Sequence, residues 1–302
     1  MHDLPAPDVP DDGVLVRVVA AGVNPIDWKI RDGIRGDRSF PLVLGQDFAG
    51  LVVAAGSRVR RYGVDDRIFG TAREHGTFAD YTAVPEDSPD NPTAKIPDDV
   101  GDADAAALPT AGLTALASLD ALGVARGTLL LINGASGSVG AFASQIAHAR
   151  GATVVGTVHS GKEDVARSLG VDVPIAYDSE DVVAALGQRY PDGIDALLDV
   201  VSDAEALKRV GGLVRRGGTV VTTIYTADIP WFEGRGVSAV NIVLNQTPQS
   251  SHQGLRELVK MVEEGTVRVV IGEEHDLSNT AVALDRGKSG KADGKIILFP
   301  SA

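Results

Sequence analysis

From residue 129 onward, short apolar runs alternate with stretches in which apolar residues recur three or four positions apart. The runs predict buried strands, and the stretches between them predict amphipathic helices. Strands are predicted at 129–134, 153–158, 173–177, 194–201, 218–224 and 239–244, with helices around 179–189, 203–213 and 251–264. Strands that alternate with helices are typical of a parallel, doubly wound sheet. We therefore expect an α/β fold class for this part of the chain.

The pattern before residue 106 differs, because short strands follow one another with glycines between them. These strands are predicted at 14–21, as a pair within 41–56, at 67–70 and at 76–84. They indicate a small, mostly antiparallel β domain. A helical stretch with a turn-like segment at 108–114 marks the change of domain, and after a strand at 266–271 the last strand, 295–299, is expected to return to the first domain. The predicted domains are 1–105 with 270–302, and 106–269.

Residues 129–140, LLLINGASGSVG, join a buried strand to a helix through a series of small residues. Ala135, Gly137 and Gly140 occupy the first, third and sixth positions of a dinucleotide-binding fingerprint. A pyrophosphate can accept hydrogen bonds from the first N–H groups of a helix, which have no partners within it. Gly137 would let the backbone approach the pyrophosphate, and Gly140 would let helix and strand pack closely. An ordinary tight turn is the alternative, and Ala135 departs from the strict pattern.

The end of the next strand indicates which dinucleotide binds. NAD-binding units usually place an acid there, ~20 residues beyond the turn, to hold the ribose 2′-hydroxyl. Here Val158 is followed by His159 and Ser160, with Lys162 close behind. A hydroxyl and an ammonium suit a 2′-phosphate, which predicts NADP rather than NAD. The alternative is that Lys162 only opens a solvated helix, although the helix dipole disfavours lysine at that end.

Composition excludes several other classes of function. The chain has 302 residues, a formal net charge of −13 and no cysteine. The negative charge opposes binding to nucleic acid or to an anionic membrane, and no apolar run approaches the ~20 residues of a membrane span. The absence of cysteine removes disulfides and zinc–thiolate sites, and the histidines lack metal-binding spacing. We expect a cytoplasmic protein without a metal site.

Several motifs occur in a shared order: GVNPIDWKIRDG, GQDFAG, GTFADYTAVP, LPTAGLTA, INGASGSVG and GKIILFP. With them the chain resembles the medium-chain dehydrogenases/reductases, most of all the zinc-free quinone oxidoreductase, or zeta-crystallin-like, branch. The resemblance implies a GroES-like domain joined to a Rossmann NADP-binding domain. It also implies NADPH-dependent hydride transfer to a quinone or an α,β-unsaturated carbonyl compound, and a homodimer. Relatives usually begin with a further β-hairpin, which we expect to be missing from this chain.

The resemblance also implies roles for particular residues. Asn24 would lie near the nicotinamide ribose, and Ile224 and Tyr225 near the nicotinamide. Ser160 and Lys162 would face the 2′-phosphate. Tyr177 would stand beside the adenosine ribose phosphate, or would simply cover the sheet edge. The pyrophosphate would be held by the residues of the fingerprint segment, namely Ala135, Ser136, Gly137, Ser138, Val139 and Gly140.

Zinc-dependent relatives carry a Cys in the segment that matches Gly22–Asp27 and a His-Glu pair where this chain has Gln46 and Asp47. A catalytic zinc would therefore lack its ligands. Asn24 and Lys29 are the candidate catalytic residues, and the alternative for Lys29 is a solvated helix lysine. His75 is more simply explained as a surface loop residue. We name no protein acid, since water or a ribose hydroxyl can deliver the proton.

Two other functions remain open on the sequence alone. The chain could bind NADPH without turnover, as a regulatory or structural protein. It could also be a dedicated enoyl or ketone reductase for one biosynthetic intermediate, which would bind NADPH yet fail with simple quinones and enones. Assays of NADPH oxidation with a panel of acceptors distinguish these functions.

Overall fold

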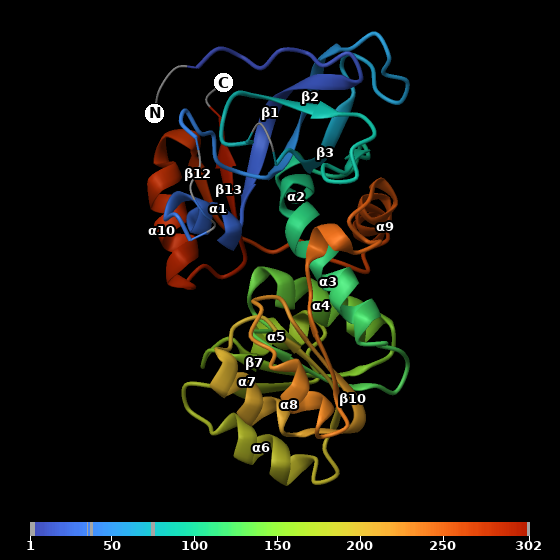
Figure 1. The fold of residues 1–302 in the computed structure, drawn as a ribbon, viewed down its shortest axis with the longest axis vertical. Coiled ribbons are helices and arrows are strands. Elements are labelled where there is room, and N and C mark those ends of the chain that lie inside the picture. Colours follow the sequence, from blue (N-terminus) through green and yellow to red (C-terminus); the bar gives the residue numbers. More distant parts are fainter. Residues whose placement is uncertain (1–3, 35, 37–38, 74–75, 301–302) are drawn as a thin grey trace. The chain divides into compact units, whose positions relative to one another are not determined.

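The computed structural model describes residues 4–34, 36, 39–73 and 76–300 (Figure 1); His75 lies outside them. The chain divides into two compact units. Unit 1 comprises residues 1–113, 248–265 and 269–302, and unit 2 comprises 114–247 and 266–268. The predicted boundary at 105/106 therefore lies eight residues before the observed one at 113/114. Residues 248–265, predicted as part of the second domain, belong to unit 1.

Unit 1 is built on a mostly antiparallel sheet with the strand order β12-β13-β1-β2-β3-β5, and β4 also pairs with β1. The strands are β1 (Gly13–Val23), β2 (Asp47–Ala55), β3 (Arg67–Thr71), β4 (Tyr81–Pro85), β5 (Thr93–Lys95), β12 (Ile271–Asp276) and β13 (Lys295–Phe299). Alternate residues of β1, such as Val14 and Val16, are fully buried in the core of this unit. β13 pairs antiparallel with β1, so the predicted return of the last strand is confirmed.

Helices of unit 1 flank this sheet. They are α1 (Pro25–Arg31), α2 (Asp102–Ala107), the start of α3 (Pro109–Ala121), α9 (His252–Glu263) and α10 (Thr280–Ser289), with a 3₁₀ turn η2 (Leu277–Asn279) before α10. α9 belongs to unit 1, and the Nδ1 atom of its first residue, His252, accepts a hydrogen bond from the N–H of Thr93 on β5 (3.0 Å). None of the helices in the described residues has the length and apolar character needed to cross a membrane.

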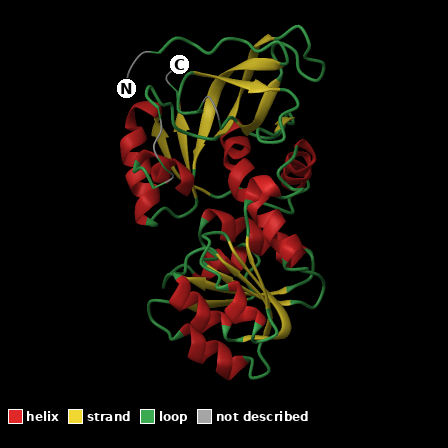
Figure 2. Ribbon diagram, viewed as in Figure 1, coloured by secondary structure: helices red, strands yellow, loops and turns green. Residues whose placement is uncertain are grey.

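Unit 2 contains a fully parallel sheet with the strand order β11-β10-β9-β6-β7-β8. The strands are β6 (Leu129–Asn133), β7 (Thr153–Val158), β8 (Val173–Ala176), β9 (Ile194–Asp199), β10 (Val214–Thr222) and β11 (Ser238–Asn241). Helices cover both faces (Figure 2). They are α4 (Ser138–Ala149), α5 (Glu163–Ser168), α6 (Val182–Arg189), α7 (Ala204–Gly211) and α8 (Ile229–Glu233), with a 3₁₀ turn η1 (Leu244–Gln246). The predicted doubly wound sheet is confirmed.

The strand order of unit 2 reverses at β6. From β6 the chain builds outward through β7 and β8, then returns to the other side for β9, β10 and β11. Loops that leave β6 and β9 therefore diverge at the carboxyl ends of these strands. In open α/β sheets, ligands bind at such a switch point.

Three details of the sequence prediction were wrong. Residues 41–56 hold one strand, β2, because the chain turns at Gly45 (φ +93°) instead of pairing with itself. The segment 76–84 is strand only from Tyr81 onward. Instead of a turn at 108–114, Pro109 starts α3, a position where its missing N–H costs nothing.

The predicted strand at 266–271 was also wrong, since β12 begins only at Ile271. The backbone of Arg268 makes its hydrogen bonds to a side chain instead of a neighbouring strand. Its N–H donates to Gln145 Oε1 (2.8 Å), and its C=O accepts from Gln145 Nε2 (3.0 Å). A helix side chain thus makes the backbone hydrogen bonds that the apolar run TVRVVI had led us to expect from a neighbouring strand.

Candidate dinucleotide site

The turn between β6 and α4 uses its glycines for different purposes. A Cβ added at Gly140 would lie 2.1 Å from the carbonyl oxygen of Gly134, so only glycine lets the helix approach the turn this closely. A Cβ added at Gly137 would meet only the same oxygen, at 3.5 Å. Gly137 caps α4 with an ordinary φ of −75°. Space is therefore open in front of the first turn of α4, where an anion can approach the backbone.

Ala135 fits the turn because a glycine faces it from the neighbouring strand. Its N–H donates to the carbonyl of Thr157 on β7 (3.0 Å). A Cβ built at Gly156 would lie 2.7 Å from the Cβ of Ala135. The departure from the fingerprint at Ala135 is thus matched by the small residue opposite.

A polar network that was not predicted from the sequence supports the turn between β6 and α4 by hydrogen bonds from the neighbouring strands. Thr157 accepts from the N–H of Gly134 (2.9 Å) and donates to Asn133 Oδ1 (2.6 Å). Asn133 in turn donates to Asp199 Oδ2 and to Ser202 Oγ, each at 2.8 Å. Asp199 is fully buried. These side chains come from the ends of β6, β7 and β9. A polar residue near the end of each of these adjacent strands was the feature of the sequence from which the network could have been predicted.

The other predicted cofactor residues of unit 2 follow strands whose carboxyl ends lie along the same sheet edge. Ile224 and Tyr225 come after β10, on one side of the turn, and Tyr225 has the left-handed φ of +64°. Lys162, which caps α5, and Tyr177 follow β7 and β8 on the other side. An elongated ligand with its centre at the turn of β6 would run along this edge.

At the β7–β8 end of this edge, Ser160 is paired with a carboxylate. Its N–H donates to Asp178 Oδ1 (2.8 Å) and its hydroxyl to Oδ2 (2.6 Å). The hydrogen bond from the Ser160 hydroxyl lowers the pKa of the Asp178 carboxyl below its usual value. The hydrogen bond from the Ser160 N–H lowers this pKa further, by a smaller amount. His159 Nε2 lies 3.4 Å from Oδ2, and the ring of Tyr177 meets that of His159 edge-on. Asp178 was not predicted, because the acid of an NAD-binding unit is expected at the end of β7 and not after β8.

Asn24 lies in unit 1, almost fully buried at 3% exposure. Its amide nitrogen donates to Asp47 Oδ2 (2.8 Å) and weakly to the Gly22 carbonyl (3.4 Å). Its amide oxygen accepts from the ammonium of Lys295, which also lies 3.2 Å from Asp47 Oδ2. Thr110 donates its hydroxyl to the other oxygen of Asp47 (2.6 Å). We call Asn24, Asp27, Asp47 and Lys295 the buried polar cluster.

Asp27 completes this cluster as a second acid. Its Oδ2 accepts from the N–H of Asn24 (2.7 Å), whereas its Oδ1 is buried without a hydrogen-bond partner. Burial raises the pKa of Asp27 to about 7, against the effect of the Asn24 hydrogen bond, and the nearby Asp47 adds to the rise. Below this pKa the protonated Asp27 adds no negative charge to the buried polar cluster.

Lys29, the other candidate catalytic residue, lies on α1 and is half-buried. Its Nζ lies 5.5 Å from the ring centroid of Trp28, at a distance suited to a cation–π contact. Gln46, just before β2, accepts a hydrogen bond from Ala72 N–H with its backbone carbonyl (2.8 Å).

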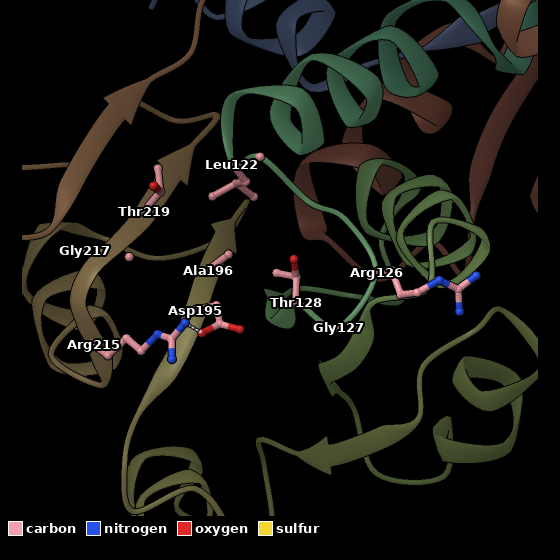
Figure 3. A pocket seen from close by; sticks show the side chains of 11 residues that line it. Leu122, Arg126, Gly127, Thr128, Asp195, Ala196, Arg215, Gly217 and Thr219 are labelled. Atoms are coloured by element: carbon pink, nitrogen blue, oxygen red, sulfur yellow. Dashed lines mark ion pairs between the residues drawn. The ribbon is translucent and has the colours of Figure 1, made fainter.

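A polar cavity of about 330 Å³ also lies in unit 2 (Figure 3). It is bordered by Thr128 and Asp195, at the amino ends of β6 and β9, and by Thr219 of β10. Arg215 and Asp195 pair across part of it (2.7 Å), whereas Arg126 points away. Because dinucleotides bind at the carboxyl ends of such strands, this cavity is distinct from the candidate site.

Comparison with known proteins identifies the family. The alcohol dehydrogenase GroES-like domain matches residues 10–98, and the zinc-binding dehydrogenase family matches residues 169–298. A 2-methylene-furan-3-one reductase of Solanum lycopersicum is 33% identical, over 97% of this chain and 73% of the relative. A chloroplast envelope quinone oxidoreductase homolog of Arabidopsis thaliana is 30% identical, over 98% and 92%. The chain belongs to the medium-chain dehydrogenase/reductase superfamily, in its zeta-crystallin-like quinone oxidoreductase branch.

Solved structures of medium-chain dehydrogenases/reductases agree with this placement. The quinone oxidoreductase of Pseudomonas syringae superposes with a TM-score of 0.89 at 28% identity, covering 99% of this chain and 94% of its own. A mycobacterial protein solved in complex with NADPH has a TM-score of 0.87 at 25% identity, with the same coverage.

Proposed function

We propose that this protein is a zinc-independent, NADPH-dependent reductase that transfers a hydride to a quinone or an α,β-unsaturated carbonyl compound. Its relatives are named as reductases of such acceptors, and one of them is named an NADPH-dependent alkenal/one oxidoreductase. The observation that carries the proposal is the turn after β6, where Gly140 is packed against Gly134 while Gly137 leaves the helix terminus open.

The residues of unit 2 fit a dinucleotide along the sheet edge. The N–H groups at the start of α4 would receive the pyrophosphate, and the network of Asn133, Thr157 and Asp199 keeps the turn in place. Ser160 and Lys162 would face the adenosine ribose, and Ile224 and Tyr225 the nicotinamide. When bound, NADPH supplies the hydride, so the protein has to bind, orient and shield the reactants.

Asn24 fits the role of a hydrogen-bond acceptor. Both protons of its amide nitrogen are directed at Asp47 and Gly22, and one lone pair of its oxygen is taken by Lys295. An amide oxygen has two lone pairs, so a ribose hydroxyl is the proposed second donor to it. Asp47 and Lys295 fix which way the amide points. Lys29 stays a candidate for contact with the acceptor.

The surroundings of Asp47 support independence from zinc. Relatives that use zinc carry a ligand pair at positions 46 and 47, but here Gln46 replaces the first ligand. The carboxylate of Asp47 is already held by Thr110, Asn24 and the ammonium of Lys295. An ammonium at this place would repel a metal ion. Among the described residues, no three His, Cys, Asp or Glu side chains come together as metal ligands.

The test is NADPH oxidation by the purified protein with a panel of quinones and enones, before and after prolonged treatment with a strong chelator. We expect oxidation with at least one acceptor and an unchanged rate after chelation. NADPH binding without oxidation of any acceptor would favour a binding protein or a dedicated reductase for another substrate. Activity lost on chelation and restored by zinc would disprove the zinc-independent mechanism.

A further inference from the structure

We infer that Asp178 is a specificity-determining residue of the dinucleotide site: by holding Ser160, it narrows the preference for NADPH and lets the protein use NADH as well. This inference rests on the proposed function, because it concerns the ribose end of the same site. Asp178 lies two residues beyond β8, whereas the acid of an NAD-binding unit ordinarily stands at the end of the strand that corresponds to β7.

The hydrogen-bond donors of Ser160 are not freely available to a 2′-phosphate. Ser160 has a backbone N–H and a hydroxyl, and both are directed at the same carboxylate, at 2.8 Å and 2.6 Å. A phosphate that used either donor would have to displace Asp178 from it. Charge-assisted hydrogen bonds of this kind are the strong ones, so the displacement lowers the affinity for the phosphate.

The second step concerns charge. Asp178 is ionised at neutral pH, since the Ser160 donors favour its charged form. Its side chain is 30% exposed, so water screens it only in part. A 2′-phosphate placed at Ser160 would meet this negative charge at close range. At ~4 Å the repulsion reduces the affinity by about fivefold even in bulk water, and by more near a protein surface.

The third step concerns the 2′-hydroxyl of NADH. A carboxylate accepts hydrogen bonds and has lone pairs beyond the ones that Ser160 uses. Asp178 can therefore accept from the ribose hydroxyl, which is the role of the usual acid in NAD sites. Lys162 acts in the opposite direction, because its ammonium attracts the phosphate. The balance of Lys162 and Asp178 leaves both dinucleotides usable.

The experiment compares Asp178→Asn with the wild-type protein by calorimetry, using 2′,5′-ADP and 5′-AMP as probes that differ only in the 2′-phosphate. We expect Asp178→Asn to raise the affinity for 2′,5′-ADP by about fivefold or more and to lower the affinity for 5′-AMP, whose 2′-hydroxyl loses the carboxylate as an acceptor. The ratio of kcat/KM for NADPH to that for NADH should rise by a similar factor. Asp178→Ser, a second neutral variant, should shift the ratio in the same direction.

Asp164→Asn is the matched control, because it removes one negative charge from α5, where Asp164 pairs with Arg167 and not with Ser160. It should leave the preference unchanged. When Ser160→Ala is combined with Asp178→Asn, the gain in affinity for 2′,5′-ADP should be smaller than with Asp178→Asn alone, since the two residues act as a pair. If both neutral variants bind the probes with the wild-type ratio, the inference about Asp178 is overturned while the proposed function stands. If the wild type binds neither probe nor dinucleotide, the proposed function fails and the inference with it.

Discussion

Ala135 and Gly156 face each other so closely that a methyl group at position 156 would stand 2.7 Å from the Cβ of Ala135. Ala135 belongs to the turn that follows β6, and Gly156 lies in the middle of β7. The methyl group that breaks the glycine pattern at the turn is therefore accommodated by a missing side chain on the next strand. The two positions act as one packing unit.

We predict that Gly156→Ala destabilises the protein by about 1–3 kcal/mol, the usual cost of an extra carbon in a filled core. Urea denaturation measures the change. Adding Ala135→Gly should recover only part of the loss, because Val171 Cγ1 also lies 2.9 Å from the new methyl position. Gly63→Ala is the control, since a Cβ there has no atom within 4 Å. Equal effects of Gly156→Ala and Gly63→Ala would contradict the packing argument.

The glycines of the turn should respond differently to substitution. Gly137→Val should fold with little change in stability, because the backbone at Gly137 is ordinary and its Cβ position is open. Its methyl groups would fill the space in front of α4, so affinity for NADPH should fall by about tenfold or more. Gly140→Ala should instead lower stability, as its methyl group meets the Gly134 carbonyl. Calorimetric NADPH affinity that is unchanged in a folded Gly137→Val would place the pyrophosphate elsewhere.

Lys162→Ala should lower kcat/KM for NADPH by about tenfold and leave the value for NADH nearly unchanged, because only NADPH carries the 2′-phosphate. Lys162→Glu should have a larger effect, since it adds repulsion. Both effects should weaken at higher ionic strength. Lys260→Ala, at the exposed pair with Glu264, serves as the control. If NADPH kinetics are insensitive to position 162, the phosphate is held by another residue.

Asp27 should make stability depend on pH. Its pKa rises from 3.8 in the unfolded chain to about 7 in the folded protein. The native state therefore holds a proton that the unfolded state has lost, and this contribution, complete below pH 3.8, is lost as the pH rises through about 7. The slope is about 1.4 kcal/mol per pH unit within that window.

Asp27→Asn, which resembles the protonated acid, should remove this slope and leave the variant more stable than the wild type at pH ~8. Urea unfolding at pH ~5 and ~8 measures the difference. Asp32→Asn is the control: Arg31 and then Lys288 hold the pKa of Asp32 at about 2, so its effect should be the same at both pH values. A constant offset for Asp27→Asn as well would show that Asp27 is ionised throughout.

Apolar runs were enough to predict the parallel strands of unit 2, because strands covered on both faces need continuous hydrophobic residues. The local pattern failed where a distant group decided the backbone. The side chain of Gln145 takes the backbone hydrogen bonds of Arg268, so the strand predicted there does not form. Pro109 starts a helix in a segment whose small residues had predicted a turn. Such choices depend on contacts that no short window of sequence contains.

In the candidate site, too, the local pattern was predictable and the contacts between distant residues were not. The fingerprint turn was visible in the sequence because its small residues, Ala135, Gly137 and Gly140, lie within six consecutive positions. Asp178 was not visible, because it follows a different strand, β8, and lies eighteen positions along the chain from Ser160. Lys295 was also missed, since it opens the apolar run of β13, where a buried ammonium has no signature apart from its partners Asn24 and Asp47.

The pairing of β1 with β13 has a consequence for how the protein is made. Residues 114–247 form nearly all of unit 2, so this unit can fold while the ribosome is still synthesising the chain. Unit 1 is completed later, because residues 21–23 of β1 gain their β13 partners, and Asp47 gains the ammonium of Lys295, only when the end of the chain emerges. Until then the end of β1 that pairs with β13 has an unpaired edge, and chaperone binding during synthesis should concentrate on the first unit.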